Sequence, residues 1–459
     1  MRLEREKATR RWARASLNFR TMWRNWSGEL ECHPTREVHP ASVEEVRHAL
    51  RVAQATGVKV RVAGAGHSFS DLVLTNGTLL VLDRMNRVLD VDVPGQRVRV
   101  EAGIRLHALS ARLAAHGLAL PNLGDIDVQS VAGALSTGTH GTGARLPNIS
   151  AQVEAMELVT ADGTLVRCSA SDGNLDLFRA ARVALGSLGV IVSVTLRCLP
   201  AFNLSAVEGP VALETLLGQL ESWTAENEHA EFFVFPHCSE ALTRVNNRTD
   251  AAAGHRSALF AWADDIFLQN HVLGAVMGLG RSMPGAIPTL NRMVTKLAGS
   301  KRRVDRSDRI FATPRLVRFT EMEYALPRAA ASTVVRRVLA AIETEKFDVN
   351  FPLEVRFVAA DDALLSPAHG RDTCYVAVHM YRGMAWEPYF RCVEGIMDSQ
   401  GGRPHWGKRH FQTAATLRTR YPEWDRFQAV RAQLDPRGLF MTPAMERVLG
   451  PVNADVAAG

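Results

Sequence analysis

Several features that mark common protein classes are missing from this chain of 459 residues. Its six cysteines include no close pair of the kind that builds zinc or redox sites. The longest membrane-like stretch, Ile266 to Leu279, is too short to span a bilayer and contains Gln269, Asn270 and His271. The N-terminus lacks an uninterrupted apolar core, so no secretory signal is expected. These absences predict a cytoplasmic protein with reduced thiols, and they leave open an interfacial helix at 266–279.

The chain also lacks a concentrated charge of one sign. Its formal net charge is +6, and the arginines are scattered rather than gathered in a stripe. This distribution argues against nucleic acid as the main partner. The most basic run, Lys301 to Arg303 with Arg306 and Arg309, suits a solvated loop better than a lipid-binding surface. Peripheral membrane association is therefore possible but is not predicted.

Two common nucleotide-binding motifs are absent as well, although the chain is rich in glycine at two places. These places are Val60–Ser68 and Ser130–Gly141, and each combines small residues with one histidine. The dinucleotide fingerprint fails because Phe69 stands where the third glycine belongs, and the phosphate loop of NTPases fails because Gly407-Lys408 is followed by Arg409. Glycines still let backbone N–H groups approach a pyrophosphate closely. The two stretches therefore favour a flavin-binding cradle, with a pair of tight turns as the alternative.

The alternation of strand-like and helix-like runs predicts an α+β protein, and the length of the chain predicts at least two domains that share a cleft. Strands are expected at 58–63, 79–82, 98–101, 157–166 as a hairpin, and 189–196, with a helix through Leu106–Leu118. After Pro200 longer helices alternate with strands, so the first domain is placed at residues 1–200 (core about 35–200) and the second at 201–459. Later elements are helices at 329–345 and 424–434 and strands at 231–235, 316–324, 353–359 and 375–381.

Three features in the second domain could carry chemistry. Strand alternation in Leu353–Phe357 sends Glu354 and Arg356 to one face, either as a structural ion pair or as a substrate-binding fork held by the glutamate. The segment Gly401–Lys408 has the composition of an ordered functional loop, or of a turn between domains. His379 lies on an apolar strand, where a buried structural histidine is the simpler interpretation.

The order of these motifs resembles one enzyme family along nearly the whole chain. The motifs are Gly64-Ala65-Gly66-His67-Ser68, Leu123-Gly124-Asp125-Ile126, Ala132-Gly133 to His140-Gly141, Glu354-Val355-Arg356-Phe357 and Pro404-His405-Trp406-Gly407-Lys408. In this order they resemble the aldonolactone oxidases, including gulonolactone and arabinonolactone oxidases, and the related alditol oxidases of the vanillyl-alcohol-oxidase type. The resemblance implies a two-lobed FAD-binding domain and an α+β cap domain with an antiparallel sheet. It also leaves open that residues 415–459 return to the FAD domain.

The resemblance implies FAD as the cofactor and assigns residues to two groups. His67 matches the position where many members attach the flavin covalently, although other relatives bind FAD without a bond. Gly124 matches a position where a small residue lets oxygen approach, and Asp125 departs from the serine of alditol oxidases, which favours a lactone. The cofactor-binding candidates are Gly64, Ala65, Gly66, His67, Ser68, Gly124, Asp125, Ser130, Gly133, Thr137, Gly138, His140, Gly141, Val190, His405 and Lys408; the catalytic candidates are Arg356, Lys408, Glu354 and His379.

The expected reaction is oxidation of a sugar-1,4-lactone at a ring CH–OH by hydride transfer to flavin N5, with oxygen as acceptor. Arg356 and Lys408 would stabilise the charge that develops on the substrate oxygen, Glu354 would hold Arg356, and His379 would bind a hydroxyl or relay a proton. The alternatives are an alditol oxidase, a lactone dehydrogenase that uses a cytochrome or quinone, and a carbohydrate-binding scaffold without FAD. No metal site is expected.

Overall fold

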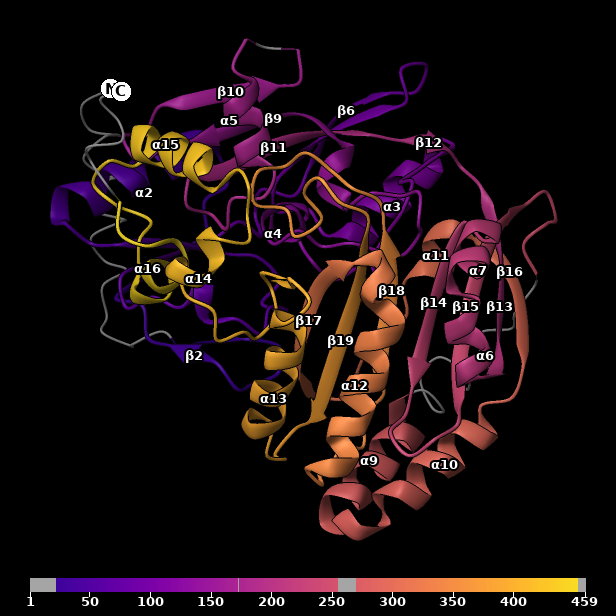
Figure 1. The fold of residues 1–459 in the computed structure, drawn as a ribbon. Helices are drawn as coiled ribbons and strands as arrows, with labels where there is room; N and C mark the ends of the chain where they lie inside the picture. Colours follow the sequence, from indigo (N-terminus) through magenta and orange to yellow (C-terminus); the bar gives the residue numbers. More distant parts are fainter. Residues whose placement is uncertain (1–21, 172, 255–269, 453–459) are drawn as a thin grey trace, which may run out of the picture.

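A computed structural model describes residues 22–171, 173–254 and 270–452, so the 266–279 stretch lies partly outside the described residues. The chain forms two sheet-containing halves that lie one above the other in Figure 1. Both halves combine helices with sheets, so the predicted α+β class is confirmed. Among the helices of the described residues, none has both the length and the apolar character needed to cross a bilayer.

The first half holds two sheets and the glycine-rich stretches. A parallel three-stranded sheet has the order β3 (Arg36–Val38), β5 (Thr78–Val81), β4 (Val60–Ala63). An antiparallel five-stranded sheet has the order β10 (Leu165–Ser169), β9 (Val153–Val159), β11 (Val190–Arg197), β7 (Arg97–Glu101), β6 (Val88–Asp92). The helices here are α2 (Val43–Thr56), α3 (Leu106–Ala115), α4 (Val131–Ser136) and α5 (Leu175–Ala181), and the two-stranded pairs are β1 (Trp23–Arg24) with β2 (Glu31–Cys32) and β8 (Leu118–Ala119) with β12 (Leu199–Pro200).

The second half is built on one antiparallel sheet of eight strands. Its order is β16 (Lys301–Arg306), β13 (Asn203–Ala212), β15 (Glu240–Thr249), β14 (His229–Val234), β18 (Leu353–Val358), β19 (Thr373–Tyr381), β17 (Phe319–Pro327), β20 (Arg403–Pro404). The helices around it are α6 (Leu213–Gly218), α7 (Leu220–Glu226), α9 (Leu273–Ser282), α10 (Ile287–Leu297), α11 (Ser307–Phe311), α12 (Ala331–Thr344) and α13 (Glu387–Asp398). Figure 1 shows α12 and α13 lying along the sheet.

Alternation along the central strands gives this sheet two different faces. On β18 the side chains of Leu353, Val355 and Phe357 enter the hydrophobic core that α6, α12 and α13 cover. The residues between them, Glu354 and Arg356, point to the opposite face, as strand geometry requires and as the sequence predicts. Helices therefore protect one face, and the other face is available for a site.

The chain ends on the first half of the molecule. The elements are α14 (Ala414–Arg418), α15 (Trp424–Leu434) and α16 (Pro443–Leu449). Side chains from Leu417 to Leu449 belong to the same hydrophobic core as the strands of the first half. The backbone N–H of Val60, the first residue of the first glycine-rich stretch, donates to the carbonyl of Leu439 at 3.0 Å. The C-terminal segment thus supports strand β4, with which that stretch begins.

Most expected elements form within a few residues of their predicted bounds. The Asp-Gly hairpin is β9–β10, the helix at 424–434 is α15, and the strand at 353–359 is β18. The helix expected through Leu106–Leu118 is too long, since α3 ends at Ala115 and Leu118 starts strand β8. Gly117, with φ of +69°, turns the chain between them, a conformation that favours glycine.

Candidate active site

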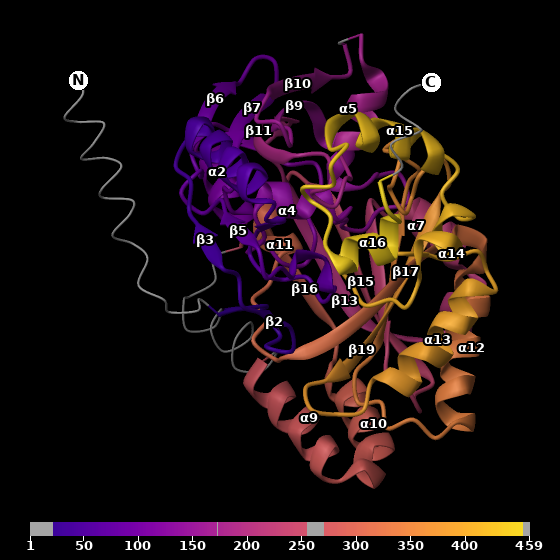
Figure 2. The ribbon, with the colours of Figure 1, turned by 90° about the vertical axis from the view of Figure 1, so that its left-hand side faces the viewer.

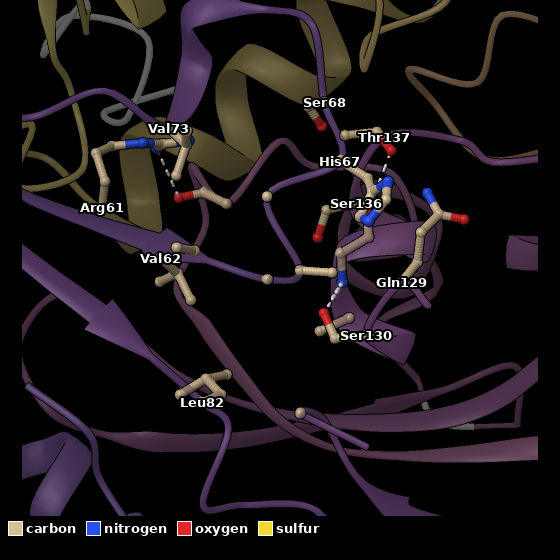
Figure 3. A pocket seen from close by; sticks show the side chains of 18 of the residues that line it. Arg61, Val62, His67, Ser68, Val73, Leu82, Gln129, Ser130, Ser136 and Thr137 are labelled. Atoms are coloured by element: carbon tan, nitrogen blue, oxygen red, sulfur yellow. Dashed lines mark hydrogen bonds between the residues drawn. The ribbon is translucent and has the colours of Figure 1, made fainter. Parts of the chain in front are cut away.

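The two glycine-rich stretches, which lie about 65 residues apart in sequence, form one pocket. Its empty space is about 1050 Å³, with the open mouth included. Figure 3 shows side chains from both stretches around it, among them His67, Ser68, Ser130, Ser136 and Thr137. Gly64, Ala65, Gly66 and Gly133 complete this part of the wall. Both stretches therefore line one open pocket, although they are distant in sequence.

Direct contact between the stretches explains why glycine occupies these positions. A Cβ built on Gly64 would lie 2.6 Å from Oγ of Ser130, which caps α4 by accepting a hydrogen bond from the N–H of Gly133. Gly66 has φ of +73°, where a side chain causes strain. Any larger residue at these positions would fill the cradle, so the wall consists largely of exposed backbone. This wall suits a nucleotide diphosphate, which backbone N–H groups bind well.

His67 sits in this pocket in its neutral form. Burial lowers the pKa of its imidazole to about 4, and the nearby positive charges of Arg105, Lys408 and Arg318 act in the same direction. The ring also stacks on Trp26, with centroids 5.3 Å apart. At neutral pH one ring nitrogen therefore keeps a free lone pair, which a covalent bond to a flavin requires.

Beside the pocket, the polar face of the large sheet carries a buried arginine surrounded by carboxylates. Nε of Arg356 donates to Glu231 at 2.8 Å, and its Nη2 contacts Glu354 and lies 3.7 Å from Asp125. Glu231 is the register partner of Arg356 on the neighbouring strand β14. Arg356, Glu231 and Glu354 are each less than 10% exposed. The network holds the guanidinium in one orientation, because its planar fork meets an acceptor on each side.

The carboxylates around Arg356 differ in protonation. Burial raises the pKa of Glu354 to about 7, helped by the charges of Asp125 and Glu231 and opposed by Arg356. Burial also tends to raise the pKa of Asp125, but Arg356, Arg315 and Lys408 hold it well below its usual value. Asp125 is therefore a permanent anion, whereas Glu354 can gain or lose a proton near neutral pH, as a general base or acid does.

A second cation is held on the same face by a carboxylate of strand β17. Nζ of Lys408 donates to Glu321 at 2.5 Å, and Glu321 is the register partner of His379. Burial lowers the pKa of Lys408, but the negative charges of Glu321 and Glu323 outweigh this effect and raise the pKa, so the side chain stays charged. The Nδ1 of His379 lies 3.1 Å from the carbonyl of Pro352, and its Nε2 faces Glu321 at 3.6 Å and Glu354 at 3.8 Å.

The Gly401–Lys408 segment connects this polar face to the pocket. After β20 it turns so that the carbonyl of Gly407 accepts from the N–H of Phe69, at 2.7 Å, two residues beyond His67. Lys408 lies over the ring of Phe69, with Nζ 5.2 Å from its centroid. The two halves of the molecule thus bring the cationic cluster next to the glycine-lined pocket.

Three further buried groups, His140, Glu323 and His405, place their potential ligand atoms within 4.8 Å of one another. Their hydrogen bonds do not favour a metal ion. Burial lowers the pKa of His405 to about 3, and its Nδ1 accepts from the N–H of Gly407, so the one proton of the neutral ring is on Nε2. Nε2 of His140 pairs with Glu323 at 3.2 Å, and its ring stacks on Tyr375. The cluster is better described as a set of buried polar contacts that support the loop.

The structure does not place every candidate cofactor residue on the pocket wall. Val190 stays a prediction: Gly189 and Ile191 line the pocket, and the buried side chain of Val190 between them points away, so any contact with the cofactor would use its backbone. Gly138, with φ of +70°, and Gly141, which packs on Asn122 and Leu123, shape the backbone. The remaining residues off this wall are Gly124, Asp125, His140, His405 and Lys408.

Sequence reasoning missed four charged residues of the site: Glu231, Glu321, Glu323 and Arg315. Nη2 of Arg315 donates to Asp125 at 3.1 Å. The three glutamates lie on β14 and β17, in strands whose other residues are mostly apolar, and each is about 5% exposed. An acidic residue in an apolar strand was the available signal, since carboxylates are rarely buried without a partner. Nothing in the sequence indicates that Arg315 reaches Asp125.

The pocket and the charged face beside it define an FAD-dependent oxidoreductase, and comparisons with known proteins agree. Residues 34–169 match the FAD binding domain family, and residues 194–448 match the D-arabinono-1,4-lactone oxidase family. The chain belongs to the D-arabinono-1,4-lactone oxidase family, as its motifs predict. FAD is its cofactor, and the residues of the cradle fit that group.

Two relatives and one solved structure illustrate the match. The chain is 46% identical to L-gulono-1,4-lactone dehydrogenase of Mycobacterium tuberculosis, over 94% of this chain and 99% of the relative. It is 36% identical to L-gulonolactone oxidase of Bos taurus, over 93% and 98% of the two chains. Its fold is similar to that of cholesterol oxidase from Brevibacterium sterolicum, with a TM-score of 0.81 at 20% identity, covering 94% and 97% of the two chains.

Proposed function

We propose that this enzyme oxidises an aldono-1,4-lactone of the L-gulono type at the ring CH–OH carbon next to the carbonyl. The names of the bovine and mycobacterial relatives support the substrate class. The charged face supports it too, because its carboxylates and cations can bind the several hydroxyls of a sugar lactone. The observation that carries the proposal is Arg356, fixed between Glu231 and Glu354 beside the FAD pocket.

FAD, when bound, supplies the acceptor for the hydride that leaves the hydroxyl-bearing carbon. The protein supplies charge and proton transfer. Arg356 and Lys408 stabilise the negative charge that grows on the substrate oxygen, since both are cationic and held in place before the reaction. Glu354, with a pKa of about 7, takes the hydroxyl proton. His379, held at Nδ1 by the Pro352 carbonyl, binds a neighbouring hydroxyl through Nε2.

Oxygen is the acceptor that we propose for the second half of the cycle, with hydrogen peroxide as the product. Gly124 supports it, because this glycine matches the position where a small residue lets oxygen approach in the family that the motifs resemble; a Cβ here would lie only 3.2 Å from the carbonyl oxygen of His140. The name of the mycobacterial relative supports the competing choice, a redox partner other than oxygen. A cytoplasmic location is proposed as well, since every cysteine, within the described part of the chain, is a free thiol.

An anaerobic substrate panel followed by air tests the proposal. L-gulono-, L-galactono- and D-arabinono-1,4-lactone should bleach the flavin absorbance of the purified holoenzyme faster than xylitol or sorbitol at equal concentration. Admission of air should then restore the yellow colour and release peroxide. Faster bleaching by the polyols would refute the lactone assignment. Bleaching by lactones without reoxidation in air would refute the oxygen assignment alone.

A further inference from the structure

The helix pair formed by α9 and α10 exposes several apolar side chains on its outward side. Both helices lie at the end of the second half opposite the sheets of the first half, in both views of the ribbon (Figures 1 and 2). Val272, Ala275, Leu279 and Met283 follow one another at three- and four-residue intervals and are exposed. Leu279 is 47% and Met283 57% exposed. This spacing puts Ala275 and Leu279 on one stripe of α9, and Val272 and Met283 flank the two ends of the helix.

The outward stripe of α10 mixes apolar and basic side chains. Thr289, Arg292, Met293, Lys296 and Leu297 are its exposed residues, again at helical intervals. Leu297 is 76% exposed, the largest value among the exposed large apolar residues of the described chain. Arg292 and Lys296 stand beside the two apolar side chains, so this face offers both kinds of contact at once.

The inner sides of the same helices are already used. Met277 of α9 is 1% exposed and packs with Phe235 and Phe351 in a small core beneath the pair. Asn291 of α10 donates from its amide to the carbonyls of Pro236 and Val349. The pair is therefore firmly attached to the sheet, and its exposed stripes are not needed to hold it there.

Charge distinguishes among the surfaces that could cover these stripes. From His271 to Val304 the sequence contains no Asp or Glu, but it contains Arg281, Arg292, Lys296 and the run Lys301–Arg303. Arg281, Arg292, Lys296, Lys301 and Arg302 are all exposed. The same face of a second copy would bring like charges together, which is unfavourable. A surface that is both apolar and anionic matches this composition.

We propose that the outward face of α9 and α10 is a docking surface for an anionic lipid bilayer. Leu279, Met283, Met293 and Leu297 enter the boundary between headgroups and acyl chains, and Arg281, Arg292 and Lys296 contact the phosphates. Helices with this pattern lie in the plane of the interface and do not span the membrane. The docking surface is separate from the proposed reaction, and neither depends on the other.

Vesicle sedimentation of the FAD-loaded enzyme tests the proposal. Vesicles of one part phosphatidylglycerol to two parts phosphatidylcholine should sediment the protein, binding should weaken as salt rises, and pure phosphatidylcholine should bind less. Leu279→Gln with Leu297→Gln should reduce binding by about tenfold or more. Arg292→Glu with Lys296→Glu should reduce it by about thirtyfold or more.

A matched variant controls for surface changes in general. Leu165→Gln with Arg112→Glu alters an exposed leucine of β10 and an exposed arginine of α3, both in the first half, and should bind vesicles as the wild type does. All variants should keep the wild-type turnover rate and circular dichroism spectrum. The proposal fails if the wild type does not bind the anionic vesicles, or if both α9–α10 variants bind as the control does. It also fails if the wild type is a dimer in solution that these substitutions dissociate.

Discussion

Replacing Arg356 with lysine tests whether the orientation of the guanidinium, and not its charge alone, drives the reaction. The guanidinium donates to Glu231 through Nε, at 2.8 Å, and contacts Glu354 through Nη2. A lysine has a single nitrogen at its end, so it can keep one of these contacts but not both. Losing one hydrogen bond between charged groups costs about 1.5–3 kcal/mol. This free energy corresponds to about 10- to 150-fold in rate, if the contact positions the charge in the transition state.

The assay is stopped-flow reduction of the flavin under anaerobic conditions with L-gulono-1,4-lactone. Arg356→Lys should reduce flavin about 10- to 150-fold more slowly than the wild type. Its flavin content should be unchanged, because Arg356 is not on the wall of the pocket.

Arg244→Lys is the matched control for this prediction. Arg244 belongs to the same network, donating to Glu208 at 2.7 Å and lying 3.4 Å from Glu231, but it makes no contact with Glu354. Its substitution should slow reduction by less than about tenfold. A wild-type reduction rate in Arg356→Lys, or equal slowing in the two variants, would show that the fork has no special role.

Three other predictions concern the pocket and the proton acceptor. Acid precipitation should release the FAD of His67→Ala into solution, whereas the wild type should keep its flavin in the precipitate, because the neutral imidazole of His67 can form a covalent bond to it. Release of flavin from the acid-treated wild type would refute the covalent bond and leave the fold assignment unaffected. The rate of flavin reduction should rise with pH around 7, because Glu354 loses its proton above its raised pKa and only the ionised form accepts the hydroxyl proton. Glu354→Gln should flatten this pH profile. An unchanged profile in that variant would show that another group accepts the proton. In the His67→Ala background, where FAD is held without a bond, Gly64→Ala should weaken FAD binding about tenfold or more by displacing Ser130. Gly395→Ala in the same background, with open space around its Cβ, should not weaken it; equal FAD dissociation constants in the two double variants would contradict the cradle.

Local pattern predicts a large part of this molecule correctly. Strand alternation at 353–357 separates Glu354 and Arg356 from the core side chains, and the structure confirms that separation. The Asp-Gly turn predicts the β9–β10 hairpin, because its backbone geometry suits a tight turn between antiparallel strands. Both results depend on neighbours in the chain, so sequence alone contains the information.

Other site residues were not predicted, because the cause of their placement is distant in sequence. Glu231 and Glu321 become site residues only because β14 and β17 lie near β18 in the sheet. Arg315 reaches Asp125 across 190 residues of chain. Sheet order and loop path decide these contacts, and no local pattern specifies them.

The sequence by itself determines the two glycine-rich stretches, the paired Glu354 and Arg356 and the order of motifs that identifies the family, since each depends on residue type and short spacing. Tertiary structure alone decides that these parts meet. It brings Gly64 against Ser130, places the Lys408 loop on Phe69 and surrounds Arg356 with carboxylates from three separate segments. The protonation of Glu354 also depends on this packing, because burial and neighbouring charges, not residue type, raise its pKa to about 7.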